Sequence, residues 1–476
     1  MNKLNSSLKL LSKLEQSPQL MPLVETLVEK SLNGSLCYQR NLNHSINQAI
    51  EQIEALISEQ LRQVLHHSSF SQLEGRWRGL QNLVKSTEDG SLIKIKILSC
   101  QENELYNDFD SVPEFDQSQI YKKLYEQEFG TAGGQPYAAL VVDYEFDHSH
   151  AHTKLLHQLA QVAAAAFCPI ISAASPSLLG LKAWHELNKP RELSSLFDNI
   201  DYLNWNKLRE QAEARFVYLC LPRCLAREAY SPHNQFNQAF NFNEFADAQD
   251  AKNPANYCWM NSAYSLASLM VKAFNRYSWC INIRGSEGGG RVENLPFAVF
   301  KNSVGEYHYQ CPTEINITDR REAELSQLGL LPLCHYKNTD YAVFFGVESI
   351  QKVKSYDKKE ASENAHISAR LPYIMATSRF AHYLKIMARN KIGHFMDVSE
   401  TSDKLNRWIL NYVNGNKNSK EELKAKYPLA EARVEVREIA GKLGSYEAIT
   451  WLRPWLQMEE LTTSLRLVAK IPHKEP

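Results

Sequence analysis

The sequence lacks the features that mark secreted, membrane-spanning and nucleic-acid-binding proteins. No run approaches the roughly 18 apolar residues that a membrane-spanning helix needs. The first segment, Met1–Gln16, places lysines within an apolar pattern, so we expect no signal peptide there. Lysine and arginine total 53 against 54 aspartate and glutamate residues, so no net charge favours nucleic acid or an anionic membrane. We therefore expect neither nucleic-acid binding nor direct membrane insertion.

Cysteine pairs at metal-binding spacing are also missing. The nine cysteines are scattered, and none forms a Cys-x-x-Cys pair. The nearest two, Cys220 and Cys224, have no second cysteine or histidine pair at zinc spacing. This pattern is typical of free thiols in a reducing cytoplasm. It predicts a cytoplasmic protein with no metal site and no cofactor.

A long amphipathic helix is predicted for residues 42–66. Apolar residues recur there every three or four positions, among them Ile46, Ile50, Ile53, Ile57 and Leu61. Such a stripe needs a partner surface. Upstream of it, residues 8–28 carry two shorter amphipathic patterns.

The middle of the chain predicts a sheet covered on both faces. Tyr137–Tyr144 is a continuous apolar run, a helical pattern follows over 154–166, and Pro169–Ala174 is a second strand candidate. This order indicates parallel strands joined by a crossover helix. Arg215–Leu221 predicts a further buried strand. From Ser91 to Ile97, isoleucines at every second position alternate with Leu92, Lys94 and Lys96, which predicts another strand.

The C-terminal part predicts two helices, over 369–390 and 402–412, followed by three antiparallel strands. Alternating patterns cover 432–437, 446–451 and 464–471. The third places Leu465, Leu467, Ala469 and Ile471 on one face. Together the patterns predict a mixed α/β, multi-domain fold with sheets flanked by helices, a helical N-terminus and C-terminal antiparallel strands.

A glycine-rich turn is the strongest candidate for chemistry. Gly285–Gly290 resembles a phosphate-binding loop, but Arg291 stands where a Walker loop has its lysine, and Pro296 interrupts any following helix. We predict instead that Gly288, Gly289 and Gly290 form a structural turn, through positive φ or close backbone packing.

Other polar clusters have structural interpretations that we prefer. His148, His150 and His152 would share one face of a strand and hold a metal, but no distant ligand can be named, so a solvated connection is favoured. The neighbours Arg76, Trp77 and Arg78 are residue types that stack on nucleic-acid bases. The balanced charge of the chain favours a different role, with Trp77 as a core anchor. We therefore expect no catalytic residues and no enzyme.

Four segments in the same order resemble the large-subunit family of the type VI secretion contractile sheath. They are Phe70–Leu80, Arg284–Pro296, Arg370–Lys385 and Arg453–Leu467. The resemblance implies a structural protein that pairs with a small sheath subunit, stacks with copies of itself as hexameric rings around an inner-tube protein, and contracts from a baseplate to expel that tube. It also implies disassembly by an AAA+ unfoldase that recognises an N-terminal helical region.

The resemblance suggests roles for several residues. The stripe from Ile46 to Leu61 becomes the candidate interface with the small subunit, and the strand from Leu465 to Ile471 the candidate for strand exchange. The family's charged helix that touches the inner tube is similar to the segment 419–427, which makes Glu421, Glu422, Lys424 and Lys426 candidate tube contacts.

Three regions follow from these assignments. We expect residues 1–68 to be a helical region for pairing and unfoldase recognition, 69–360 the central α/β sheath part, and 361–476 the C-terminal helices and strand-exchange sheet. Two alternatives stay open. One is a sheath protein of another contractile injection particle, and the other is an enzyme that binds a phosphorylated ligand at Gly285–Gly290.

Overall fold

The computed structural model describes residues 42–470 with gaps. The gaps are 88–90, 132, 190–191, 194, 232–239, 241, 248, 302–306, 338, 391–397, 417, 439–445 and 456–464. The predicted helical patterns of residues 8–28 and the candidate Ile471 lie outside the described residues. The chain divides into two compact units, one from residues 1–70 and 229–253, the other from 71–228 and 254–476.

The first unit contains the long helix α3 and part of an irregular segment. Helix α3 spans Leu42–Leu65, which confirms the helix predicted from the apolar stripe. Near its C-terminal end, Arg62 Nε donates to the carbonyl of Asn243 at 3.0 Å. The buried carboxylate of Glu244 accepts from the amide of Tyr230 at 2.7 Å. The described part of this irregular segment therefore contacts the end of the helix.

The second unit is built on a six-stranded sheet with the order β1-β2-β3-β9-β10-β6. Strands β1 to β3 and β9 run parallel, whereas β10 and β6 are antiparallel additions. Their bounds are Leu140–Phe146 (β1), Ile170–Ala174 (β2), Val217–Leu221 (β3), Leu331–His335 (β9), Ala342–Phe344 (β10) and Arg291–Val292 (β6). The predicted strand, helix and strand order with a parallel crossover is confirmed.

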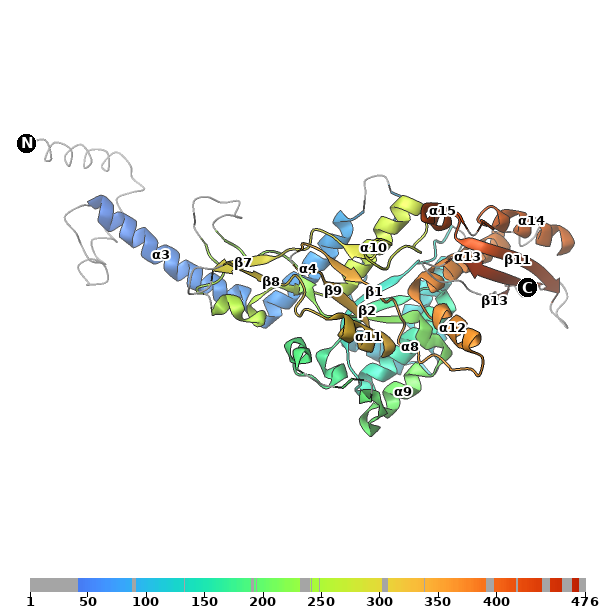
Figure 1. Cartoon of the computed structure of the whole chain (residues 1–476), viewed down its shortest axis with the longest axis horizontal. Coiled ribbons are helices and arrows are strands. Elements are labelled where there is room, and N and C mark those ends of the chain that lie inside the picture. The colour runs from blue at the N-terminus through green and yellow to red at the C-terminus, as the bar shows by residue number, and fades with distance from the viewer. Residues whose placement is uncertain are drawn as a thin grey trace, which may run out of the picture. The chain divides into compact units, whose positions relative to one another are not determined.

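Alternate side chains of these strands enter two separate cores. Ile170 and Leu219 join the cluster that includes α8 (His150–Ala166), whereas Ile171 and Tyr218 join the one that includes α10 (Ser262–Tyr277). Figure 1 shows α8 and α9 on one side of the sheet and α10 on the other. Burial on both faces explains why the strands appear as unbroken apolar runs.

Capping residues set the start of both covering helices. Ser149 Oγ accepts from the amide of His152 at 3.3 Å, and Asn261 Oδ1 accepts from the amide of Ala263 at 2.8 Å. These side chains satisfy amides that the first helical turn leaves unpaired. At the end of α8, Phe167 adopts a left-handed conformation with φ of 50° and closes the helix.

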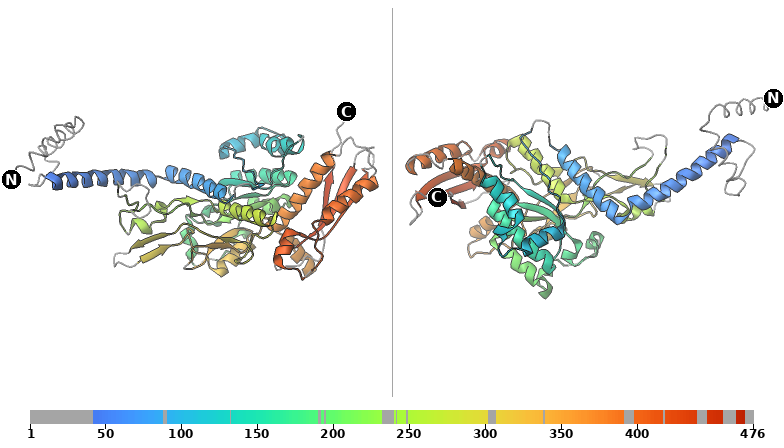
Figure 2. Two further views of the ribbon diagram at one scale, coloured as in Figure 1. Left: turned by 90° about the horizontal axis from the view of Figure 1, so that it is seen from above. Right: turned by 180° about the vertical axis from the view of Figure 1, so that it is seen from behind.

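The C-terminal part forms a three-stranded antiparallel sheet with the order β11-β12-β13. Its strands are Leu429–Glu438, Tyr446–Pro454 and Leu465–Lys470. This confirms the three predicted strands. Helices α13 (Leu371–Asn390) and α14 (Val398–Leu410) pack against the sheet, as Figure 2 shows. Trp279, Phe380 and Leu452 belong to the core between them.

Most of the remaining described elements are short, and α4 with 18 residues is the longest of them. Two-stranded sheets form between β4 and β5 and between β7 and β8. The bounds are α4 Ser68–Lys85, α5 Glu102–Asp110, α6 Gln119–Tyr121, α7 Gln127–Phe129, α9 Leu203–Arg209, α11 Asp319–Gln327, α12 Lys359–Ser368, α15 Glu421–Lys426, β4 Cys224–Leu225, β5 Trp259–Met260, β7 Ala298–Lys301 and β8 Tyr307–Gln310. A π-helical turn, Lys122–Glu126, lies between α6 and α7.

One predicted strand is absent from the described structure. The segment from Ser91 to Ile97 forms neither a helix nor a ladder, although its pattern alternates. Among the described strands, none pairs with it and supplies its hydrogen bonds.

Candidate assembly surfaces

The apolar stripe of α3 is exposed along its length. Ile46, Ile50, Ile53, Ile57 and Leu61 all lie on the surface, and Ile53 is 55% exposed. Leu56 and Val64 extend the same exposed apolar set. Burying a hydrophobic side chain stabilises a protein by about 1.5–3 kcal/mol, so a stripe left in water is a candidate surface for association.

Helix α4 contains the segment Phe70–Leu80, and two glycines of this segment lie very close to other parts of the chain. A Cβ on Gly75 would lie 2.1 Å from the carbonyl oxygen of Trp259, and one on Gly79 would lie 2.4 Å from the Tyr264 ring. Both glycines are buried because only a bare backbone fits there. Trp77 is 63% exposed, so its predicted role as a core anchor is wrong. The segment packs through its glycines, and the tryptophan faces solvent.

Helix α13 carries the segment Arg370–Lys385 and is largely buried. Phe380 stacks on Trp279 with ring centroids 4.7 Å apart, and Tyr412 meets the same two rings edge-on. Earlier in the helix, Leu371 and Met375 belong to the core beneath α10. One helix therefore joins the core of the parallel sheet to that of the C-terminal sheet.

His382 lies at the centre of this joint. Its Nε2 lies 2.9 Å from the carbonyl of Ala166 at the end of α8, and its ring is buried. Burial, with a smaller contribution from Arg379 and Lys385, lowers the pKa of His382 to about 4. The side chain is therefore a neutral packing group near neutral pH.

A lysine one turn later is enclosed by aromatic rings. Lys385 Nζ lies 5.0, 5.0 and 4.6 Å from the ring centroids of Tyr125, Phe129 and Phe167. Burial lowers its pKa to about 8. Such cation–π contacts attach the π-helical turn and the end of α8 to α13.

The C-terminal sheet has one guarded edge. The amide of Val434 in β11 donates to Asn406 Oδ1 at 2.8 Å, and Asn406 Nδ2 donates back to the Val434 carbonyl at 2.6 Å. Ser402 Oγ also approaches that carbonyl at 3.3 Å. A side-chain amide from α14 thus takes the place of a neighbouring strand at this point of the edge.

The opposite edge belongs to β13, which holds three of the strand-exchange candidates. Leu465, Leu467 and Ala469 pair with Leu452, Thr450 and Ala448 of β12. Among the described strands, none pairs with the outer edge of β13. That edge offers backbone groups on which another strand can be added.

The charged helix α15 is partly engaged by its own chain. Glu422 pairs with Arg276 at 2.9 Å, and Lys424 Nζ lies 4.6 Å from the ring centroid of Trp455. Glu421 and Lys426 are exposed, at opposite ends of the helix. Of the four candidate tube contacts, these two present their charges most directly to solvent.

The glycine-rich turn uses its backbone internally. The amide of Gly285 donates to Phe344 at 2.8 Å, and that of Gly290 donates to Gly285 at 2.9 Å. Gly289 has φ of 95°, and a Cβ there would lie 2.5 Å from the Asn282 carbonyl oxygen. A Cβ on Gly290 would approach Arg284 to 2.6 Å. Amides committed to carbonyls in this way do not form a phosphate cradle. Gly288 lies in the same turn.

The three neighbouring histidines point to different partners. His152 contacts Glu102 at 2.8 Å and Asp147 at 2.7 Å, whereas His148 stacks on Tyr202. His150 begins α8. Within the described part of the chain, no group of three or more His, Cys, Asp or Glu side chains is arranged for a metal. The described cysteines are free thiols.

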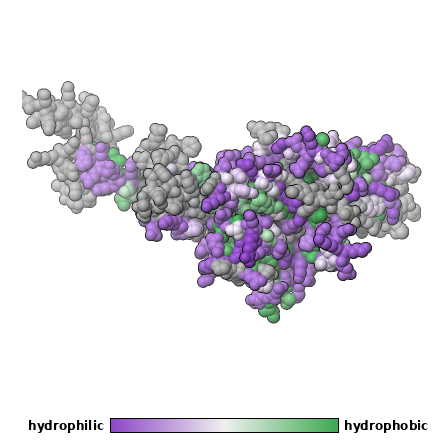
Figure 3. Space-filling view, viewed as in Figure 1, coloured by the Kyte–Doolittle hydropathy of each residue, from purple (hydrophilic) through white to green (hydrophobic). Residues whose placement is uncertain are grey.

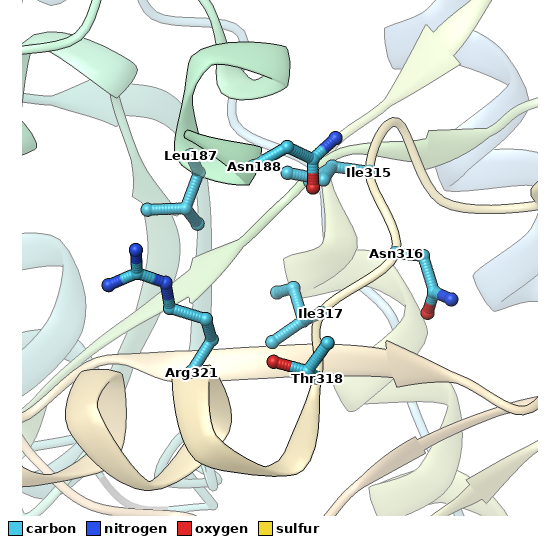
Figure 4. Close-up of a pocket in the computed structure, with 7 residues that line it drawn as sticks. All are labelled: Leu187, Asn188, Ile315, Asn316, Ile317, Thr318 and Arg321. Atoms are coloured by element: carbon cyan, nitrogen blue, oxygen red, sulfur yellow. The ribbon is translucent and has the colours of Figure 1, made fainter. Parts of the chain in front are cut away.

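A small cavity of about 110 Å³ opens beside the start of α11. Figure 4 shows its lining, which comprises Leu187, Asn188, Ile315, Asn316, Ile317, Thr318 and Arg321. Arg321 already donates to Glu324 at 2.7 Å and to the Lys189 carbonyl at 3.1 Å. These seven residues include no pair of a nucleophile and a general base, so this lining does not resemble a catalytic site.

The chain matches known proteins of one family over most of its length. A family model described as "EvpB/VC_A0108, tail sheath N-terminal domain" matches residues 47–351, and one described as "EvpB/VC_A0108, tail sheath gpW/gp25-like domain" matches 360–471. The chain belongs to this tail-sheath family. It is also 44% identical over 452 residues to the type VI secretion system sheath protein TssC1 of Pseudomonas aeruginosa, covering 94% of this chain and 90% of the relative.

Membership of the tail-sheath family gives the surfaces above their context. The chain is a structural subunit of a contractile type VI secretion sheath, with a mixed α/β fold. On the face shown in Figure 3, hydrophilic residues predominate and apolar ones form small scattered patches. No helix in the described residues has both the length and the apolar character needed to span a membrane.

Proposed function

We propose that this chain is the large subunit of its sheath and assembles with a smaller sheath protein into a helical tube in the cytoplasm. Hexameric rings of the paired subunits would enclose an inner tube and contract from a baseplate to expel it. The observation that carries the proposal is the match to sheath proteins through both the α/β part and the C-terminal sheet. We also propose that the chain has no catalytic role.

The exposed stripe of α3 is the proposed contact with the smaller subunit. Ile53→Asp would place a charge in a buried apolar interface, so copurification of the smaller protein should fall at least about tenfold. Gln52→Asp adds the same charge at a neighbouring exposed polar position and serves as the control. Copurification that survives Ile53→Asp unchanged would remove α3 from the interface.

Strand exchange is proposed at the outer edge of β13. The hydrogen bonds between Asn406 and Val434 favour the edge of β13 over the edge of β11. A strand arriving at β11 would first have to displace the Asn406 side chain. Backbone ladders tolerate rotation of the domains they join, so rings can rearrange without separating. A reconstruction of the tube should show a strand from another chain beside β13. A strand beside β11 instead would contradict the assignment.

Contact with the inner tube is proposed for α15. Exposed charge pairs are individually weak, which suits a grip that releases on contraction. The combined change Glu421→Lys and Lys426→Glu should reduce cosedimentation of the tube protein, whereas Glu360→Lys on α12 should not. Unchanged cosedimentation would place the contact elsewhere.

Recycling by an AAA+ unfoldase is the last part of the proposal. The recognition region would lie within residues 1–30, outside the described residues. Removing these residues should leave assembly possible and block disassembly by the unfoldase. Disassembly at an unchanged rate would contradict this role.

A further inference from the structure

The ammonium group of Lys385 is held by aromatic rings and has no acidic partner. Its Nζ lies 5.0 Å from the ring centroids of Tyr125 and Phe129 and 4.6 Å from that of Phe167. In the part of the chain that the structure describes, no carboxylate and no hydrogen-bond acceptor pairs with this Nζ. An ammonium has three N–H donors, and aromatic faces attract its charge without replacing the hydrogen bonds that water gives. The protonated form is therefore supported less well here than in solvent.

Two of the three rings belong to an unusual turn. Tyr125 lies in the π-helical turn Lys122–Glu126, and its ring lies between those of Tyr121 and Phe129, with centroids 5.1 and 4.9 Å away. Single π-helical turns are rare and are frequently found at functional sites. The aromatic cage of Lys385, formed by Tyr125, Phe129 and Phe167, therefore depends on a special backbone feature.

The aromatic cage lies at the surface of its unit. Lys385 and the three rings are all half-buried, whereas His382, three residues earlier on α13, is fully buried. A half-buried amine is partly dehydrated and still accessible to small solutes. Access and dehydration together distinguish Lys385 from the exposed lysines of the chain.

Neighbouring charged groups of α13 do not act as counterions. Arg379 and Arg389 are cations like Lys385, and Arg389 Nη1 donates to the carbonyls of Phe129 and Thr131 at 2.9 and 2.7 Å. The ring of His382 is neutral near neutral pH, because burial lowers its pKa to about 4. Positive charge on the same helix therefore adds no support for a protonated amine.

Acidic groups next to the cage are directed elsewhere. Glu128 of α7 pairs with Lys96 at 2.7 Å, and Glu126 is exposed. Burial lowers the pKa of Lys385 to about 8. A substantial fraction of this amine is therefore unprotonated near neutral pH, and the unprotonated amine is the nucleophilic form.

We propose that Lys385 is a site of direct acylation by small acyl phosphates. The unprotonated Nζ attacks the carbonyl carbon of the acyl group, and an N–C bond forms as the C–O bond to phosphate breaks. Phosphate leaves with the bonding electrons, and Nζ releases a proton to water. The product is a neutral amide, which ends the cation–π contacts with the three rings. Acylation therefore loosens the attachment of the π-helical turn to α13.

Acetyl phosphate and peptide mass spectrometry test the proposal on the purified full chain. At about pH 8, about half of the Lys385 amines are unprotonated, against roughly 0.4% for a lysine of ordinary pKa. A weaker base is also a weaker nucleophile, so we expect acetylation of Lys385 to be about tenfold faster than that of Lys359. The Lys359 side chain is 91% exposed, which makes it the reference site. Equal or slower acetylation of Lys385 would overturn the inference.

The pH profile of the reaction is a second readout. The rate at Lys385 should level off above about pH 8, because most of its amine is then unprotonated, whereas the rate at Lys359 should keep rising to about pH 10. In urea both sites should react alike, because unfolding removes the cage. A rate at Lys385 that rises in parallel with that at Lys359 would contradict the proposal.

A cage variant separates the rings from the rest of the fold. Phe129→Ala admits water beside Nζ, so the basicity of the amine should return toward its ordinary value and acetylation at about pH 8 should fall severalfold. Tyr356→Ala removes an exposed ring elsewhere and serves as the control. Unchanged or faster acetylation of Lys385 in Phe129→Ala would contradict the role of the cage.

Charge-matched variants test the structural consequence. Lys385→Gln removes the charge as acylation does, whereas Lys385→Arg keeps a cation beside the rings. We expect amide hydrogen exchange in the peptide 119–129 to be severalfold faster in Lys385→Gln than in the wild type, and close to wild type in Lys385→Arg. Equal exchange in all three proteins would contradict the loosening that we infer.

Discussion

Helices α3 and α13 are both long and both periodic, yet they have opposite surroundings. Helix α3 has 24 residues and keeps its large apolar side chains exposed, whereas α13 has 20 residues and buries Tyr373, Phe380 and His382. In α13 the buried residues lie on several sides of the helix, which is the pattern of a core element. In α3 the exposed apolar residues form one stripe. We therefore interpret the stripe of α3 as an interface and the many-sided burial of α13 as that of a core element.

Truncating the core of α13 should have the largest effect. Phe380→Ala removes a fully buried ring from the cluster with Trp279 and Tyr412, and we expect a loss of about 3–5 kcal/mol in the free energy of unfolding. Urea denaturation of the purified chain measures it. Leu410→Ala at an exposed position of α14 is the control. A loss no larger than that of the control would mean that α13 is not the joint between the two cores.

Acid should weaken the same joint through His382. Burial lowers the pKa of His382 from 6.5 to about 4, so the unfolded chain binds a proton more readily than the folded chain between those values. Stability contributed by the neutral ring is therefore complete above about pH 6.5 and falls as the pH drops to 4, by about 3 kcal/mol.

The variant His382→Gln isolates this contribution. It should be less stable at neutral pH but should lose less stability than the wild type between pH 6.5 and 4, as measured by urea denaturation at several pH values. His185→Gln, at an exposed site, should keep the wild-type slope. Equal slopes in wild type and His382→Gln would show that the ring does not control acid sensitivity.

A methyl group added where α4 lies against Trp259 should have an intermediate effect on stability. Gly75→Ala puts a methyl group 2.1 Å from the Trp259 carbonyl oxygen, so the helix must shift, at a cost of about 1–3 kcal/mol in unfolding free energy. At Gly415 nothing lies within 4 Å of an added Cβ, which makes Gly415→Ala the matched control. Thermal unfolding should separate the two variants, and coincident melting curves would refute the packing role of Gly75.

The smallest effect on folding is expected on α3. Ile53→Ala removes an exposed side chain, so the unfolding free energy of the isolated chain should change by no more than about 0.5 kcal/mol. Binding of the smaller sheath subunit, measured by titration, should nevertheless weaken. A large loss of stability in the isolated chain would mean that this stripe is part of a core, and would erase the contrast with α13.

The sequence predicted the helices and strands whose hydrophobic periodicity is visible within a short window. The runs that became β1, β2 and β3, the alternation of β11 to β13, and the stripe of α3 were each visible in a short window. Strands β9, β10 and β6 were not predicted, because they are short and owe their state to neighbours far along the chain.

Roles that depend on distant neighbours were hidden from the sequence in the same way. Nothing local distinguishes Gly75, pressed against Trp259, from the freely placed Gly415, or shows that Trp77 is exposed. The hydrogen bonds between Asn406 and Val434 join residues that are 28 positions apart. Of the proposed assembly residues, only those on a periodic stripe or alternating strand carried a local signal.

The most direct test of the sheath function is coexpression of this chain with the smaller sheath subunit, followed by negative-stain electron microscopy of the purified complex. We predict hollow tubules of repeating rings. Discrete particles with no tubules, from two proteins that are both folded and soluble, would contradict the function.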